Sequence, residues 1–205
     1  MERVEQCQVC RGGENRRVGV NRAFGFPAAL LECPTCGFSW LAERFSPAEA
    51  ARFYRDRYRQ VKGETLDRIR LAGDLVRARS QLRFFGPFLG GEPRILEIGA
   101  GYGVLAGHLE ECGFPPVEAI EPDGAALQAC GARAAAAGGC GGEGLPPGSF
   151  DLVILSHVLE HLADPARFLA SLRGVLAPGG VLFLEVPNSL APRGRERRER
   201  RFHLP

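Results

Sequence analysis

Residues 94–114, RILEIGAGYGVLAGHLEECGF, constrain the fold of this chain more than any other segment. An apolar run contains one acidic residue, three glycines follow at alternate positions, and an amphipathic stretch comes next. This order predicts a buried strand, a tight loop and a helix. In open α/β sheets ligands bind beyond the carboxyl ends of the strands, so the same loop predicts where a ligand lies.

The alternation of strand and helix continues toward the C-terminus. Strands are expected in VEAIE (117–121), FDLVILS (150–156) and GVLFLEVP (180–187), the last of them introduced by the turn APGG. Helices are expected at 104–112, 124–137 and 164–176. This alternation predicts an α/β protein with a Rossmann-like, doubly wound parallel sheet.

Four of the seven cysteines form two CxxC pairs, Cys7 with Cys10 and Cys33 with Cys36, with 22 residues between the pairs. Four thiolates from two turns match the closed tetrahedral shell of a structural Zn²⁺ site. One metal explains both pairs, so a redox role is less expected, and four unrelated packing thiols are the other alternative. The remaining cysteines are expected to be packing thiols: Cys112, Cys130 and Cys140.

A chain of 205 residues suits one core with a small appendage. We divide it into a zinc ribbon (1–44), a helical connector (45–85), a Rossmann-like core (86–190) and a basic tail (191–205). The start, MERVEQCQVC, is charged where a secretory signal is apolar, and no apolar run approaches the ~20 residues of a membrane span. We therefore expect a cytoplasmic protein without a membrane partner.

The connector contains two helices with clear sequence signals. The first begins at Ser46, which forms a capping box with Glu49. The second, at 66–85, is expected to pack on a larger body through the apolar positions Leu66, Ile69, Ala72 and Val76.

The glycine loop does not match a dinucleotide site. Val104 stands where the third glycine of GxGxxG belongs, and the carboxylate of Glu97 would disfavour a pyrophosphate at the helix N-terminus. A cationic ligand without phosphate fits better, although a tight strand-to-helix turn without a ligand is the structural alternative.

The stretch EIGAGYG resembles motif I of the class I S-adenosylmethionine (SAM)-dependent methyltransferases. The resemblance implies that Gly99, Gly101 and Gly103 admit the methionine and ribose portions of the cofactor, while Glu97 places its ammonium end. It also implies that Glu121, 24 positions after Glu97, takes the ribose hydroxyls. Two carboxylate oxygens suit two neighbouring hydroxyl donors.

Residues 148–165, GSFDLVILSHVLEHLADP, resemble the fourth-strand region of the same superfamily, and the likeness extends over 86–188. It implies that Ser156 and His157 lie beside the cofactor, and Glu143 is a candidate near the adenine. The letters HxxEH at 157–161 also match inverzincin peptidases, but they directly follow a buried strand and no third ligand is evident. His161 is therefore expected to be structural or to line the pocket.

The ribbon, the stretch FYRDRY and this core together resemble the zinc-binding C-methyltransferases of bacterial deoxysugar biosynthesis. This resemblance implies a nucleotide-linked sugar as substrate and makes Tyr54 and Tyr58 candidates for the substrate wall, with helix packing as the alternative. The catalytic base stays unknown, with His157 and His203 as candidates.

The leading hypothesis is methyl transfer to a small molecule. An RNA methyltransferase is the second hypothesis. Residues 193–201 carry six Arg and two Glu, a local charge of +4, so the rest of the chain has a net charge of −2. Nucleic acid is therefore not expected as a partner. The third is a truncated, non-catalytic homologue, because the family core continues into a sixth and a seventh strand that this sequence lacks. An apolar fifth strand at the sheet edge then predicts weak activity and dimerisation.

Overall fold

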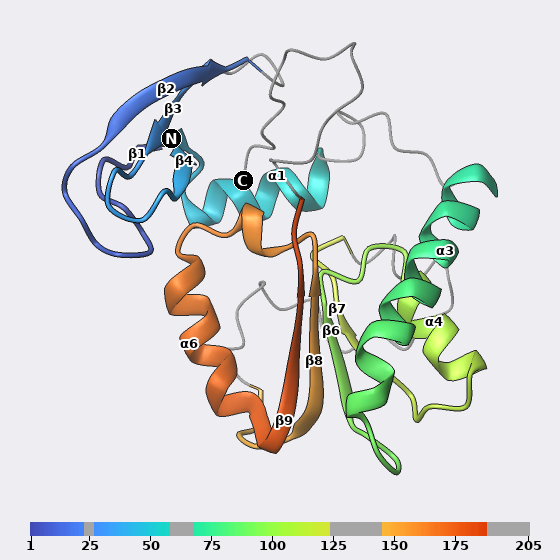
Figure 1. The fold of residues 1–205 in the computed structure, drawn as a ribbon. Coiled ribbons are helices and arrows are strands. Elements are labelled where there is room, and N and C mark those ends of the chain that lie inside the picture. Colours follow the sequence, from blue (N-terminus) through green and yellow to red (C-terminus); the bar gives the residue numbers. More distant parts are fainter. Residues whose placement is uncertain (23–26, 58–67, 124–144, 188–205) are drawn as a thin grey trace.

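The structure is a computed structural model, which describes residues 1–22, 27–57, 68–123 and 145–187, the coloured parts of Figure 1. Its centre is a four-stranded sheet with the order β7-β6-β8-β9, and all three pairings are parallel. The strands are β6 (Ile95–Ile98), β7 (Glu118–Ile120), β8 (Phe150–Ser156) and β9 (Leu176–Glu185). The expected parallel α/β sheet is therefore present.

Helices cover both faces of this sheet. The helices α3 (Arg68–Phe85) and α4 (Val104–Glu111) lie on one side and α6 (Pro165–Val175) lies on the other (Figure 1). Short 3₁₀ turns, η2 (Gly86–Phe88) and η3 (Leu159–His161), follow α3 and β8. Alternate side chains of β8 enter the two layers, since Leu152 packs toward Phe85 whereas Val153 packs toward Leu172.

The last strand begins earlier than expected. β9 starts at Leu176 and includes the APGG stretch, with a register shift opposite Phe150 and Leu152. Gly179 has a positive φ of 79°, and a Cβ on Gly180 would lie 2.9 Å from the carbonyl oxygen of Ala177. The two glycines therefore form a bulge within the strand rather than a separate turn.

The N-terminal residues form short antiparallel strands. β1 (Glu2–Arg3) pairs with β5 (Glu43–Arg44), and a second sheet contains β2 (Arg16–Asn21), β3 (Ala28–Glu32) and β4 (Ser39–Leu41). Their small core contains Trp40 beside Cys7 and Cys33, and the indole N–H of Trp40 donates to the carbonyl of Val4 at 2.8 Å.

The helix α1 (Pro47–Asp56) joins this region to the sheet. The capping box is formed, because the Ser46 hydroxyl accepts from the Glu49 amide and the Glu49 carboxylate accepts from the Ser46 amide at 2.9 Å. In Figure 1, α1 crosses above the carboxyl ends of the parallel strands. This is the edge where the sequence predicts the ligand.

The predicted packing face of α3 is wrong. Ile69 and Val76 are 84% and 65% exposed and Ala72 is exposed, whereas Ala78, Gln81 and Phe85 are buried. The helix has apolar residues on two opposite faces, and the face with the larger side chains, including Leu82 and Phe85, packs on the sheet.

Several predictions fall outside the described residues: Leu66, Tyr58, Cys130, Cys140, Glu143, His203, the helix at 124–137 and the tail at 191–205. Among the residues that are described, no helix is long and apolar enough to cross a membrane.

Candidate functional site

The glycine loop after β6 turns sharply at the carboxyl edge of the sheet. Gly99, Gly101 and Gly103 have φ values of 75°, 57° and 71°, in the left-handed region that favours glycine. A Cβ on Gly99 would lie 2.4 Å from the side chain of Val158, whereas one on Gly101 would meet nothing within 4 Å. Gly99 is thus needed for packing inside the protein, and Gly101 leaves open space beside the loop.

Glu121 lies directly against this loop. Its Oε2 accepts a hydrogen bond from the Gly101 amide at 2.8 Å, and its Oε1 accepts from the Asp123 amide at 3.1 Å. These bonds fix the carboxylate after β7 beside the loop after β6. A carboxylate oxygen has two lone pairs and can accept more than one hydrogen bond.

Glu97 is a buried carboxyl in the middle of the sheet, with 5% of its surface exposed. Burial raises its pKa to about 8; the backbone N–H of Ala106 opposes this rise, and the charge of Glu121 adds to it. Within the described parts of the chain, Oε2 of Glu97 has no hydrogen-bond partner. Such a group is costly unless a donor or a cation reaches it, which makes this oxygen the clearest sign of a ligand.

Ser156 ends β8 and His157 follows it at the same edge, and Glu185 ends β9 beside them. The Ser156 hydroxyl donates to Oε2 of Glu185 at 2.9 Å, and the His157 amide donates to the Glu185 carbonyl at 2.9 Å. Gln81, a buried side chain of α3, donates to the Ser156 hydroxyl at 2.9 Å and also to Oε2 of Glu185. Neither Gln81 nor Glu185 was predicted from the sequence.

The imidazole of His157 lies between two carboxylates. Its Nδ1 is 3.3 Å from Oε1 of Glu160, and its Nε2 is 3.8 Å from Oε1 of Glu185. Burial favours the neutral form of Glu160, but the hydrogen bond with His157 and nearby charges outweigh it and lower the Glu160 pKa. His157 itself has a left-handed φ of 57°, a strained conformation for a non-glycine residue.

The peptidase alternative fails on local geometry. His157 has a left-handed φ and only 159–161 of the HxxEH stretch form the 3₁₀ turn η3, so His157 and His161 do not share one α-helical face. Within the described ranges, the cysteine group is the one set of side chains positioned to hold a metal.

The N-terminal region contacts the segment that follows β8. Arg11 Nη2 donates to both carboxylate oxygens of Asp164, at 3.2 and 2.9 Å, and Arg44 donates to the carbonyl of Ala163. The ring of Tyr54 on α1 meets that of His161 edge-on, with centroids 5.7 Å apart. The predicted candidate Tyr54 therefore lies against the histidine segment.

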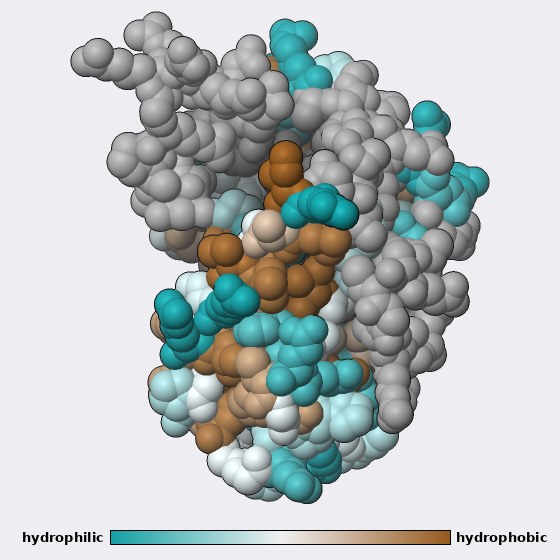
Figure 2. All heavy atoms as spheres, turned by 90° about the vertical axis from the view of Figure 1, so that its right-hand side faces the viewer, coloured by the Kyte–Doolittle hydropathy of each residue, from teal (hydrophilic) through white to brown (hydrophobic). Residues whose placement is uncertain are grey.

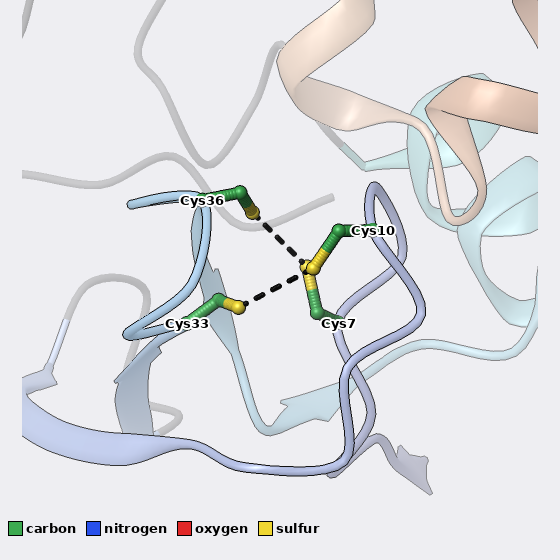
Figure 3. A group of neighbouring side chains, drawn as sticks. All are labelled: Cys7, Cys10, Cys33 and Cys36. Atoms are coloured by element: carbon green, nitrogen blue, oxygen red, sulfur yellow. Dashed lines mark hydrogen bonds between the residues drawn. The ribbon is translucent and has the colours of Figure 1, made fainter.

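The four predicted metal ligands converge on one point (Figure 3), and their sulfur atoms all lie within 4.8 Å of one another. The Cys7–Cys36 and Cys10–Cys33 sulfurs are 3.6 and 3.5 Å apart. A tetrahedral shell with Zn–S bonds of ~2.3 Å places sulfurs ~3.8 Å apart, so the spacing fits Zn²⁺.

The two CxxC turns have the same backbone geometry. The Arg11 amide donates to the Cys7 carbonyl at 3.0 Å, and the Gly37 amide donates to the Cys33 carbonyl at 2.9 Å. Arg11 and Gly37 both have a left-handed φ, of 61° and 74°. The backbone amides of Cys36 and Thr35 lower the pKa of Cys33 to about 6. The Gly12 amide lowers the pKa of Cys10, but the neighbouring sulfurs raise it to about 12, so the four thiols do not all ionise together without a cation.

Fold and site together define an α/β protein with a ligand loop at the carboxyl edge of a parallel sheet. Residues 68–204 match the family described as "Methyltransferase domain", and the chain belongs to this family of class I SAM-dependent methyltransferases.

Two curated relatives are ubiquinone biosynthesis O-methyltransferases. The protein of Caulobacter sp. (strain K31) is 37% identical over 46% of this chain and 41% of its own length. That of Caulobacter vibrioides is 36% identical over 46% of this chain and 40% of its own length. The chain thus spans about two fifths of the length of these relatives. A SAM-dependent methyltransferase from Leishmania major, with a TM-score of 0.50 and 20% identity over 66% of this chain and 58% of its own, supports the fold.

Proposed function

We propose that this chain binds SAM and transfers a methyl group to a small-molecule acceptor. The observation that carries the proposal is the unpartnered Oε2 of buried Glu97, next to an open glycine loop whose Gly101 amide is bonded to Glu121. A buried carboxylate favours a ligand with a cationic group, and the second carboxylate offers acceptors for a pair of hydroxyls. The ammonium and ribose hydroxyls of SAM supply these groups.

The residue roles follow from this arrangement. Glu97 would bind the ammonium group, Gly101 would let the backbone approach the ligand, and Glu121 would bind the ribose hydroxyls. Bound SAM supplies a methyl group on a cationic sulfur. Ser156 and His157 lie on the neighbouring strand end, and His157, between two carboxylates, is the candidate for removing a proton from the acceptor atom.

The acceptor is proposed to be a neutral hydroxyl or amine. Glu160 and Glu185 on either side of His157 would repel a phosphate placed there, which disfavours RNA as substrate. The relatives are named O-methyltransferases, and this favours a hydroxyl acceptor. A nucleotide-linked sugar, the substrate implied by the deoxysugar resemblance, is compatible if its pyrophosphate lies away from the two carboxylates.

We further propose that Cys7, Cys10, Cys33 and Cys36 hold a structural Zn²⁺ in a ribbon at 1–44, followed by a connector (45–85), the cofactor-binding core (86–190) and a basic tail (191–205). The ribbon's contacts with Ala163 and Asp164 support a role in shaping the acceptor side.

Titration calorimetry tests the central proposal. We expect S-adenosylhomocysteine and SAM to bind and NAD not to bind. Gly101→Val should abolish cofactor binding by filling the open space, whereas Gly91→Val is the matched control, with a similar φ of 62° and equally open surroundings away from the loop. NAD binding, or equal SAM binding by both variants, would contradict the proposal.

A further inference from the structure

The helix α3 carries an apolar stripe on its outer face. Ile69, Ala72, Val76 and Phe84 are spaced by 3, 4 and 8 residues, which places them on one side of a helix. Ile69, Val76 and Phe84 are 84%, 65% and 69% exposed, and Phe88 in the next turn is 66% exposed. In Figure 2, which faces the side of α3 and α4, hydrophobic residues gather on this surface. We call Ile69, Ala72, Val76 and Phe84 the outer stripe.

The inner face of the same helix is already satisfied. Ala78, Leu82 and Phe85 pack in the core on the sheet side, opposite Ile69 and Val76. Phe84 is 69% exposed, but its ring also meets that of Phe183 in strand β9, with centroids 5.8 Å apart. A helix that is apolar on two opposite faces normally has a partner on each. Four of the ten exposed large hydrophobic residues in the described ranges belong to α3 and η2, so the outer face is a patch rather than scattered single residues.

Arginines separate the two apolar faces. Arg68 and Arg79 flank one side of the outer stripe and Arg77 flanks the other, whereas Arg83 lies within the stripe near its C-terminal end; all four are exposed. The one acidic residue of α3, Asp74, is partly buried and paired with Arg70 at 3.6 Å. The exposed surface of the helix therefore combines apolar side chains with arginines, on both flanks of the stripe and at its C-terminal end.

We propose that the outer stripe of α3 docks on an anionic lipid surface. The stripe, from Ile69 to Phe84, is a ridge about 22 Å long, given 15 steps of ~1.5 Å each. A ridge with cationic flanks suits a planar, deformable interface with negative headgroups, in which apolar side chains enter and arginines stay at the headgroup level. None of the described helices is long and apolar enough to cross a membrane, whereas a helix that lies in the interface needs only one apolar face.

Vesicle co-sedimentation of the full chain tests this proposal. Wild type should bind vesicles of phosphatidylcholine with 30% phosphatidylglycerol and bind pure phosphatidylcholine at least tenfold more weakly. Ile69→Asp with Val76→Asp should lose binding to both by tenfold or more. The triple variant Arg77→Gln, Arg79→Gln, Arg83→Gln should lose about 100-fold on anionic vesicles, since each arginine near the surface contributes about 1 kcal/mol, or fivefold.

Two controls separate this surface from others. Val18→Asp with Val20→Asp introduces the same charges at exposed valines of β2, 37% and 39% exposed, and should bind like wild type. Arg197→Gln, Arg198→Gln, Arg200→Gln removes three charges from the basic tail and should lose less than the α3 triple variant. S-adenosylhomocysteine affinity should be equal in all variants, so loss of fold is distinguished from loss of docking.

Four results would overturn the proposal. They are no vesicle binding by wild type, equal binding to both vesicle types, a larger loss in the tail variant than in the α3 variant, or a dimer in solution that Ile69→Asp dissociates. The last would make a second copy of the chain the partner of the outer stripe.

Discussion

The buried carboxyl of Glu97 should couple cofactor binding to pH. Burial raises its pKa to about 8, so at pH 7 roughly nine in ten chains carry the neutral acid. If the cofactor's ammonium binds the carboxylate, binding at pH 7 must release about 0.9 proton. The observed affinity should then rise about ninefold between pH 6 and pH 7, a range in which the ligand amine stays mostly protonated.

Calorimetry with S-adenosylhomocysteine measures both quantities. Titrations in phosphate and in Tris at the same pH give the number of protons released, because the two buffers differ in ionisation enthalpy. Glu97→Gln, which keeps the shape but cannot ionise, should bind more weakly at pH 7 and show neither proton release nor the pH dependence. A wild-type affinity that is flat from pH 6 to 7, with no proton released, would refute the assignment of Glu97 to the ammonium.

The same carboxyl should affect folding stability. Its folded pKa is raised above the ordinary value of 4.5, so the unfolded chain loses this proton at a lower pH than the folded chain does. The free energy of unfolding should therefore fall between about pH 4.5 and pH 8 and then level off, by up to ~5 kcal/mol for this group. Urea denaturation at pH 5 and pH 8 measures the fall, and the wild type should lose more stability than Glu97→Gln. Equal losses would contradict the raised pKa.

Other contacts give sharper local tests. Purified protein should contain about one Zn²⁺ per chain. Removal of the metal by chelation or by Cys33→Ser should shift the fluorescence emission of Trp40, the one tryptophan, to the red, because the packing of the indole is lost. An unchanged spectrum would count against a metal-dependent ribbon. Asp164→Ala should cost about 1–2 kcal/mol in chemical denaturation by removing the α6 N-cap and an ion pair, whereas Asp164→Asn keeps the cap and should cost less. Gln81→Leu should cost about 1–3 kcal/mol in the same assay, since it removes the donor to two acceptors at the strand ends.

The sequence predicted the elements whose conformation is decided locally. The run before Gly99 is apolar over a strand length and the glycines that follow need left-handed backbone, so strand β6 and its loop appear where expected. The face of α3 was mispredicted because both sides of that helix are apolar. Tertiary packing on the sheet decides which side is buried, and it leaves Ala78 and Phe85 each 1% exposed.

The candidate site likewise contains residues that local sequence identifies and residues that only tertiary packing brings together. Glu97 lies within β6 and Glu121 directly follows β7, and their spacing around the glycine loop made both of them candidates by resemblance to a known motif. Gln81 and Glu185 are 104 positions apart and meet only because α3 packs over the ends of β8 and β9. A glutamine within an arginine-rich helix carries no local signal of such a role, so no single-sequence pattern could have found this pair.

At Arg11 the local backbone conformation favours glycine, whereas the ion pair with Asp164, far away in the sequence, favours arginine. Arg11 has a left-handed φ of 61°, as Gly37 has in the other CxxC turn, so local geometry favours glycine there. This conformation costs an arginine ~1 kcal/mol relative to glycine. The exposed ion pair with Asp164 contributes at most about the same amount. Arg11→Ala should therefore lose the pair and keep the strain, while Arg11→Gly loses both. We expect the glycine variant to be the more stable of the two by about 1 kcal/mol in denaturation of the zinc-loaded protein, and the reverse order would show that this turn is not strained.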